Sequence, residues 1–238
     1  MVHKRSTPMD IYHQMIRAYG PQGWWPAATA FEMMIGAILT QNTSWTHVEK
    51  AIANLREAHL LEAKALLESD EEEVATLIRP SGFYRQKAAR LRELARFYLN
   101  HGGVEGLKRW PITTLRHRLL EVHGIGPETA DSILLYGLEK PIFVVDAYTK
   151  RVFHRLGILP EELEEYSEVQ RFIQTRVANT LSLYKEFHAL IVEHAKRHCH
   201  ATPQCKGECP LSNHCRHRQQ GHMAIPLRES APILAETA

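Results

Sequence analysis

Long apolar runs and a strong net charge are both missing from this sequence. No stretch of about 18 or more apolar residues, the length a membrane helix needs, occurs in the 238-residue chain. The opening segments MVHKRSTPMD and IYHQMIRAYG are too polar for the apolar core of a signal peptide. A formal net charge of +2 neither favours nor excludes a nucleic-acid partner. These absences predict a cytoplasmic protein that meets no membrane.

Strand-like segments are also scarce. PIFVV, at residues 141–145, is the only short run rich in β-branched residues, and we expect it to be an extended linker. Elsewhere apolar residues recur at steps of three and four, as in FEMMIGAILTQ and HVEKAIANLREAHLL. With 44% hydrophobic residues, the chain can bury the core of one large domain or of two modest ones. The fold class predicted is all-α.

Cysteine is absent from the first 198 residues and then clustered. All four cysteines fall in one segment, with the spacing C-x5-C-x3-C-x5-C, at Cys199, Cys205, Cys209 and Cys215. A disulfide framework would use such residues in a secreted protein, but a cytosolic chain favours a metal or iron–sulfur site. Four thiolates suit either a tetrahedral zinc ion or an iron–sulfur cluster, and spacing alone does not decide between them.

The stretch HGIGPETAD, at residues 123–131, has the pattern of a glycine hairpin that opens a helix. Thr113 is expected to cap the helix before the hairpin, and Pro127 stands at the first position of the helix after it. Gly124 and Gly126 allow the backbone to come close to another surface. Free amides at a helix start favour an anion such as a DNA phosphate. A tight connection inside a helical bundle is the alternative explanation.

An aspartate follows this motif at a helix start. Asp146 comes directly after the apolar run IFVV and precedes the amphipathic segment AYTKRVFHRLG, so capping that helix is its simplest role. Hairpin and aspartate together resemble the helix-hairpin-helix DNA glycosylases of the endonuclease III superfamily, from about Trp24 to Cys215. The residues that match are Gly124, Ile125, Gly126, Thr129 and Ala130 in the hairpin, and Val145 and Asp146 in the element after it.

This resemblance implies a two-domain helical fold and a DNA partner. The domains expected are a six-helix barrel at residues 28–138 with the hairpin at about 113–138, a second domain at 1–27 plus 139–220 with the cysteine loop 199–215, and a tail at 221–238. The partner implied is double-stranded DNA that contains a damaged base. The protein is expected to act as a monomer and to associate with the nucleoid.

The resemblance also implies a hydrolytic reaction. Asp146 would stabilise the oxocarbenium-like sugar and activate the attacking water, two tasks that suit a carboxylate. Bifunctional members carry a lysine two residues after the second hairpin glycine, where this chain has Glu128. A carboxylate cannot form a Schiff base, so we expect a monofunctional glycosylase. Glu128 is equally explained as a favourable acid in a first helical turn.

Further motifs resemble the 3-methyladenine DNA glycosylase branch. They are GIG-x-E-T-A-D, VVDAYTK, WWPAATAFE, LTQNT and RPSGFYRQKA. A cationic methylated purine is bound well by aromatic faces, so we expect a base pocket formed by Trp24, Trp25, Pro26, Trp45 and Glu128. Core packing would explain each tryptophan alone. The alternative functions are a mismatch or oxidised-pyrimidine glycosylase of the same fold and a non-catalytic DNA-binding module.

Base flipping leaves a gap in the duplex that the protein must fill. By resemblance the residues that enter it are Gln41, Asn42 and Phe83, although Phe83 could instead belong to the core. The hairpin residues Gly124, Ile125 and Gly126 would contact the phosphate backbone.

The cysteine loop departs slightly from the family pattern. The family's [4Fe-4S] loop is C-x6-C-x2-C-x5-C, so three cysteines coincide with its ligands and Cys205 falls one residue early. The resemblance therefore implies a [4Fe-4S] cluster on Cys199, Cys205, Cys209 and Cys215, with zinc as the alternative.

Overall fold

The structure is a computed structural model that describes residues 6–203, 205 and 209–219. Within these residues every regular element is a helix and no strand occurs, which confirms the all-α prediction. None of the helices in this part of the chain is long and apolar enough to cross a bilayer. The expected tail at 221–238 lies outside the described residues.

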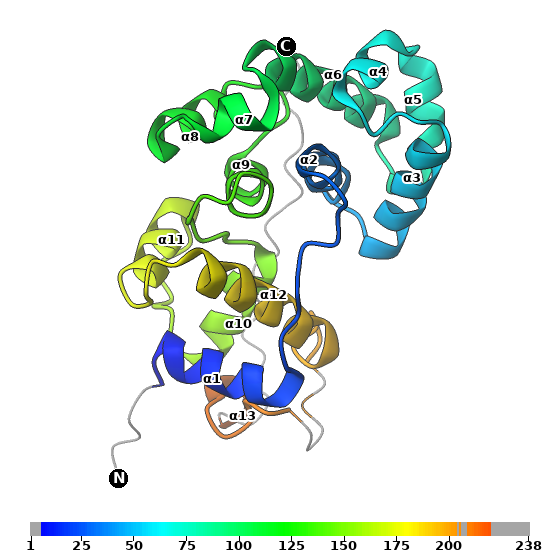
Figure 1. Ribbon diagram of the computed structural model, residues 1–238. Helices are drawn as coiled ribbons and strands as arrows, with labels where there is room; N and C mark the ends of the chain where they lie inside the picture. Colours follow the sequence, from blue (N-terminus) through cyan, green and yellow to red (C-terminus); the bar gives the residue numbers. More distant parts are fainter. Residues whose placement is uncertain (1–5, 204, 206–208, 220–238) are drawn as a thin grey trace.

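The first group of helices surrounds α2, which spans Ala30–Leu39. Every residue of α2 after the first is buried, as expected for a helix whose sequence, AFEMMIGAIL, is apolar on nearly all sides. Figure 1 shows α3 to α8 as an arch around α2 and α9. The elements are α3 (Trp45–Glu57), α4 (Ala63–Glu68), α5 (Glu71–Leu77), the 3₁₀ turn η1 (Arg79–Ser81), α6 (Tyr84–Asn100), α7 (Gly103–Lys108), α8 (Ile112–Leu120), α9 (Pro127–Ser132) and the π-helical η2 (Ile133–Gly137). The segment expected to be a six-helix barrel, 28–138, thus contains eight α-helices, several of them one or two turns long.

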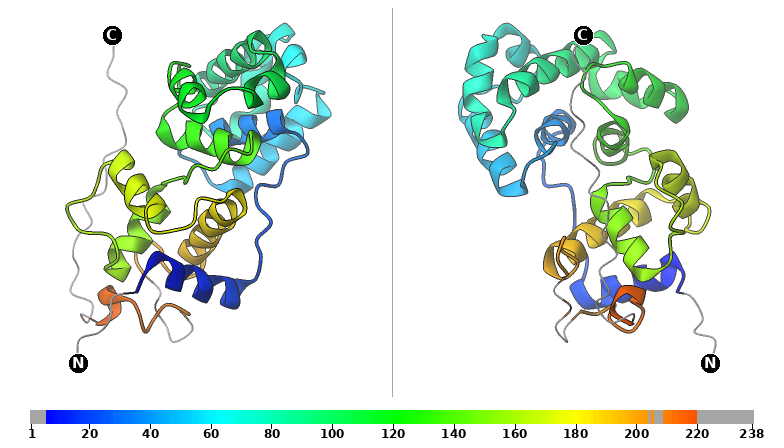
Figure 2. Two further views of the ribbon diagram at one scale, coloured as in Figure 1. Left: turned by 60° about the vertical axis from the view of Figure 1, so that its left-hand side comes forward. Right: turned by 180° about the vertical axis from the view of Figure 1, so that it is seen from behind.

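The second group draws on both ends of the chain. It comprises α1 (Pro8–Tyr19), α10 (Ala147–Leu156), α11 (Tyr166–Gln174), α12 (Leu181–Arg197) and α13 (Arg216–Gln219). The long helix α12 packs against α1 and α10 and also touches η2, so it connects the two groups. Figure 2 shows the same separation into two groups from two further directions.

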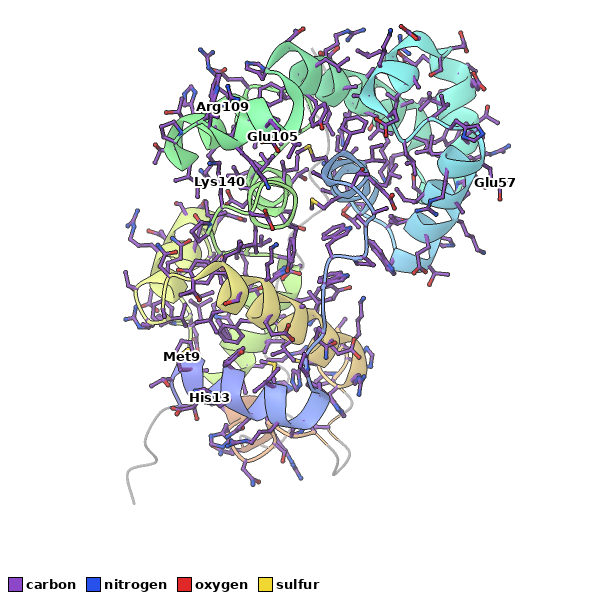
Figure 3. All side chains as sticks on the ribbon, in the orientation of Figure 1. Met9, His13, Glu57, Glu105, Arg109 and Lys140 are labelled. Atoms are coloured by element: carbon purple, nitrogen blue, oxygen red, sulfur yellow. The ribbon has the colours of Figure 1, made fainter. Side chains whose placement is uncertain are left out.

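The chain returns from the first group to the second through residues 139–146, which have no regular secondary structure. Lys140, labelled in Figure 3, fixes the start of this segment, because its Nζ donates to the carbonyls of Lys108 and Trp110 at 3.0 and 2.7 Å. Phe143 is fully buried and Val145 nearly so. The segment is therefore the extended linker expected from PIFVV, and it carries Asp146 to the start of α10.

One local prediction was wrong. Thr113 does not cap α8, because this helix begins at Ile112 with Pro111 at the capping position and without a side-chain cap. Thr113 is the second residue of α8, inside the first turn, so it does not occupy the capping position. Pro111 occupies the capping position instead, with φ of −56° and ψ of 142°, and its ring fixes this φ.

Candidate active site

Asp146 stands at the N-terminus of α10 and is 9% exposed. Its Oδ1 accepts hydrogen bonds from the N–H and the O–H of Thr149, both at 2.7 Å, so the residue is the helix cap that the sequence predicts. Burial alone would raise the pKa of the Asp146 carboxyl, but the adjacent His188 and the bonds from Thr149 outweigh it and lower that pKa. One oxygen, Oδ2, is left for other contacts.

His188 of α12 faces that second oxygen. Its Nε2 lies 3.6 Å from Oδ2 of Asp146, and the residue is 4% exposed. Its Nδ1 is 2.8 Å from the hydroxyl of Tyr136, which also donates to the carbonyl of Lys185 at 3.1 Å. The ring of Trp24 lies nearly parallel to the imidazole, with centroids 5.9 Å apart. The sequence did not point to His188, because nothing in its local pattern distinguishes it among the 15 histidines of the chain.

Glu128 lies in the first turn of α9, close enough to Asp146 for the two carboxyls to influence each other. The residue as a whole is exposed, while protein atoms crowd around its carboxyl. Burial and the charge of Asp146 raise the pKa of Glu128 to about 7, although Lys150 acts in the opposite direction. The site therefore pairs two carboxyls with pKa values displaced in opposite directions.

The three tryptophans predicted for a base pocket do form one cluster. Trp24 and Trp25 are stacked with centroids 5.2 Å apart, and Trp45 meets Trp25 edge to face at 5.4 Å. A hollow of about 240 Å³ beside them is lined by Trp25, Pro26 and Trp45, together with the acidic and basic side chains of Glu32, Glu49 and Arg56. Trp24 lies on the other side of Trp25, against His188. The aromatic cluster therefore extends from the hollow to the residues around Asp146.

The glycine hairpin is held by residues of α6 and of the loop after α2. Gly124 has a φ of +83°, which favours glycine, and Arg90 of α6 packs directly over it. Gln41 connects the two, because its Nε2 donates to the carbonyl of Gly124 at 3.0 Å and its Oε1 accepts from Arg90 at 2.6 Å. Ile125 is 4% exposed and anchors the hairpin in the core. Gly126 stands at the capping position of α9, with open space where a side chain would be.

Asn42 and Phe83 are prominent on the surface of the loops beside the hairpin. Phe83 is 61% exposed, so it is not the core residue that the alternative interpretation required. Asn42 is exposed, and both residues have positive φ values, +52° and +47°. Lys87, by contrast, is 1% exposed, and its Nζ donates to the carbonyls of Leu39 and Ser81 at 3.0 and 2.7 Å. The buried ammonium of Lys87 thus binds the chain just before the loop that carries Asn42 and just before the loop that carries Phe83.

A buried network centred on Asp131 fixes the geometry behind the site. Asp131 is 0% exposed and accepts two hydrogen bonds from Arg116, at 2.7 and 3.1 Å. It also accepts from the hydroxyl of Tyr166 and the amide of Gln170, each at 2.7 Å. The same hydroxyl accepts from the N–H of Val145 at 3.3 Å. The helix that carries Glu128 is therefore tied to the residue next to Asp146.

The four cysteines line a single pocket at the end of α12. Arg155 donates to Sγ of Cys199 at 3.3 Å and to the carbonyls of His200 and Ala201, and Arg151 donates to the carbonyl of Cys199. Burial and the neighbouring sulfurs raise the pKa of the Cys209 thiol to about 11. Among the described residues no three His, Cys, Asp or Glu side chains are close enough together to hold one metal ion. The donor set, four sulfurs around one pocket beside a guanidinium, fits a thiolate-ligated cluster.

Comparison with known proteins identifies relatives along most of the chain. Residues 35–190 match the family model of the HhH-GPD superfamily of base excision DNA repair proteins. A protein of Methanocaldococcus jannaschii, provisionally named a DNA repair glycosylase, is 47% identical over 86% of this chain and 94% of its own length. Endonuclease III of Thermotoga maritima is 32% identical over 80% of this chain and 85% of its own length.

Solved structures show the same helical arrangement. The H. pylori 3-methyladenine DNA glycosylase bound to 1,N6-ethenoadenine superposes with a TM-score of 0.70 at 33% identity, covering 81% of this chain and 98% of that one. An endonuclease III–DNA complex superposes with a TM-score of 0.76 at 23% identity, covering 90% and 98%, a level that supports the fold alone.

Proposed function

The chain belongs to the HhH-GPD superfamily of base excision DNA repair proteins and is a DNA glycosylase, and we propose that it is a monofunctional one that removes alkylated purines of the 3-methyladenine type. The observation that carries the proposal is Glu128, a carboxyl beside Asp146 at the position where a lyase would have an amine. The proposed partner is double-stranded DNA with one damaged base, bound by a monomer.

Asp146 is the proposed catalytic residue. Its buried carboxylate has a free oxygen, Oδ2, because Oδ1 is occupied by Thr149. A carboxylate held ionised in a site of low polarity stabilises positive charge that develops on a sugar. The same oxygen can accept a proton from the water that attacks the anomeric carbon. Asp146 therefore combines the role of helix cap with that of catalyst.

The absence of an amine at position 128 supports hydrolysis without strand cleavage. A Schiff base requires a nucleophilic nitrogen, which a carboxyl cannot supply. Lys150, the basic group that influences Glu128, is held by a hydrogen bond from its Nζ to the carbonyl of Glu164 at 2.5 Å. The product expected is an abasic site with an intact backbone.

The tryptophan cluster is the proposed binding site for the base. Trp25 and Trp45 line the hollow and offer ring surfaces to it, and Trp24, which is stacked with both Trp25 and His188, would support the pocket from behind. A cationic purine gains about 0.5 to 2 kcal/mol from each aromatic face that it covers. Pro26 and Glu128 complete the proposed pocket, which favours a base that carries a positive charge.

The DNA surface proposed for this enzyme comprises the hairpin and two loops. The amides of Gly124 and Gly126 before α9 are suited to a phosphate, whereas the N–H of Ile125 donates to the carbonyl of Val122 at 3.0 Å, so Ile125 would contribute by anchoring the hairpin. Gln41, Asn42 and Phe83 are proposed to enter the duplex where the base has left. Gln41 would then exchange its bonds to Arg90 and Gly124 for contacts with the DNA.

A [4Fe-4S] cluster is the cofactor proposed for the cysteine pocket. Cys199, Cys205, Cys209 and Cys215 would hold it, and when bound it would cross-link the end of α12 to the segment before α13. Arg155 is placed to compensate the negative charge of thiolate ligands. Iron and acid-labile sulfide in equal amounts would support the cluster, whereas one zinc per chain without visible absorption would exclude it.

A panel of duplexes with one lesion each tests the function. We expect release of 3-methyladenine by the wild-type protein and none by Asp146→Asn, with duplex binding retained by the variant. Release from a thymine or adenine mismatch or from an oxidised pyrimidine, without release of 3-methyladenine, would contradict the proposed specificity. Duplex binding by a wild type that releases no base would favour a non-catalytic module.

A further inference from the structure

One face of α3 lines the hollow beside the tryptophan cluster. Its lining residues are spaced three or four positions apart, so they stand in one row along the helix: Trp45, Glu49, Ile52 and Arg56. The neighbouring helix α2 contributes Glu32 and Gly36 in the same way, and the segment 25–27 closes the remaining side. The hollow is therefore a product of regular helical spacing in two helices that pack on each other.

The rings and the size of the hollow suit one planar base. Pockets for drug-sized ligands have volumes of about 300 to 1,000 Å³, and this one has about 240 Å³. The rings of Trp25 and Trp45 meet at 85°, so they form two walls of a corner. A Cβ at Gly36 would lie 3.2 Å from Nε1 of Trp25, so glycine at this place in α2 gives the ring its room.

Three charged side chains line the hollow, and two of them neutralise each other. Glu32 is 5% exposed, and its Oε1 accepts a hydrogen bond from Arg56 at 2.6 Å. Its Oε2 accepts a longer bond from the N–H of Ala28 at 3.4 Å. Glu32 and Arg56 therefore form an ion pair that contributes no net charge to the hollow.

The third charged residue, Glu49, has a neutral partner. Its Oε1 accepts from the indole N–H of Trp45 at 2.8 Å, one helical turn away. Within the described part of the chain no basic side chain forms an ion pair with Glu49. Glu128, the acid expected in the pocket, is not among the described residues that line the hollow. One uncompensated negative charge thus remains at the hollow, and it belongs to Glu49.

We propose that Glu49 is the residue by which this glycosylase selects bases that carry a positive charge. The proposal rests on the proposed function, because it takes the hollow as the place of the flipped base. A purine methylated at a ring nitrogen is cationic in DNA and is attracted by the carboxylate, whereas a neutral base of the same shape gains only the ring contacts. Glu49 is exposed, so solvent screens its charge, and the preference expected from it is moderate, about 2- to 5-fold.

The competing explanation is that Glu49 serves only to orient Trp45. Glu49→Gln separates the two roles, because its amide oxygen can still accept from the indole N–H while the charge is gone. Glu49→Lys replaces the attractive charge by a repulsive one. The matched control is Glu57→Gln, which removes one charge from the end of the same helix. Glu57, labelled in Figure 3, is also exposed but does not line the hollow.

Two lesions that differ in charge but not in shape test the proposal. The first is 3-methyladenine, and the second is 3-deaza-3-methyladenine, in which carbon replaces N3 so that the methylated base is neutral. Affinity for the first duplex is taken from the protein concentration that gives half-maximal base release in single turnovers, and affinity for the second from equilibrium binding. The ratio of the two affinities cancels the contribution of the phosphates, which both duplexes share. Melting temperatures are recorded for every variant.

Glu49→Gln should lower this ratio about 2- to 5-fold by weakening only the binding of the cationic lesion. Glu49→Lys should lower it further, and Glu57→Gln should leave it unchanged. If the ratio is the same in both Glu49 variants as in the wild type, or if binding of the two lesions weakens equally, the selective role of Glu49 is refuted. An equal fall of the ratio in Glu57→Gln refutes it as well, since the effect would then not come from the hollow.

The two levels of the argument fail in different ways. A wild type that releases no 3-methyladenine overturns the proposed function, and the role of Glu49 falls with it. A wild type that releases 3-methyladenine, together with a ratio that Glu49 does not affect, overturns the role of Glu49 alone. If Glu49→Gln does not fold, the ratio in Glu49→Lys decides.

Discussion

Replacing Gly124 by alanine should damage the hairpin, whereas the same change at Gly126 should not. A Cβ at position 124 would lie 2.3 Å from Cγ of Arg90 and 2.4 Å from Cδ, far inside contact distance. At position 126 a Cβ would meet no atom within 4 Å, and the φ of −89° is ordinary for alanine. The two glycines of one motif therefore have different physical reasons for being glycine.

The magnitude follows from two contributions. Alanine in the left-handed region costs about 1 to 2 kcal/mol. Displacing Arg90 breaks its hydrogen bond to Gln41, a bond to a charged group that is worth about 1.5 to 3 kcal/mol. Gly124→Ala should thus lower the free energy of unfolding by about 2.5 to 5 kcal/mol. Gly126→Ala should leave it within about 0.5 kcal/mol or raise it slightly, because alanine restricts the unfolded chain.

Urea denaturation of the two variants measures this difference directly. In a protein that already carries Arg90→Ala, the clash is absent. There Gly124→Ala should lower the free energy of unfolding only by the cost of the left-handed backbone. Equal stabilities of the two glycine variants would refute the reasoning. Duplex affinity gives a further result: Gly126→Ala should bind DNA more weakly despite its native stability, because the methyl group occupies the approach of a phosphate.

Three other substitutions test the buried polar residues around the candidate site. Asp131→Asn removes the charge from a fully buried partner of Arg116 and should lower the free energy of unfolding by about 3 to 5 kcal/mol; a loss below about 1 kcal/mol in urea denaturation would contradict this. Lys87→Met keeps the length of the side chain but removes the hydrogen bonds to both carbonyls, so base flipping should weaken more than duplex binding does. The fluorescence of 2-aminopurine beside the lesion measures the flipping, and equal losses of flipping and binding would indicate a purely structural role. The pKa of Glu128 is raised to about 7 in the folded state, so between about pH 4.5 and 7 the folded protein keeps a proton that the unfolded chain has lost, and the free energy of unfolding should fall as the pH rises. Glu128→Gln should flatten the plot of melting temperature against pH over this range. If the plots for the variant and the wild type are parallel, Glu128 does not titrate in this way.

The sequence was sufficient where one residue type and its neighbours determine the structure. The Asp146 cap follows from a carboxylate before an amphipathic helix, and the burial of α2 follows from its apolar composition. The exposure of Phe83 was left open by sequence reasoning. The local pattern does not show that the buried side chain in this segment is Lys87, which binds the carbonyl of Ser81, while Phe83 stays exposed.

Other features depend on contacts between distant segments. His188 reaches Asp146 only because α12 packs on α10, and Asp131 meets Tyr166 across 35 positions of sequence. Neither pair has a spacing that a single sequence could reveal. Thr113 failed as a cap for a local reason, since Pro111 already ended the loop and shifted the start of α8.

The most direct test of the central claim follows base and backbone in one reaction. A duplex with a single 3-methyladenine is incubated with excess protein, the free base is quantified, and the labelled strand is examined before and after treatment with alkali. We expect stoichiometric release of 3-methyladenine and a strand that is cut only after alkali, with no adduct trapped by borohydride. A strand already cut without alkali, together with a trapped covalent adduct, would show an amine-dependent lyase and contradict the assignment made from Glu128.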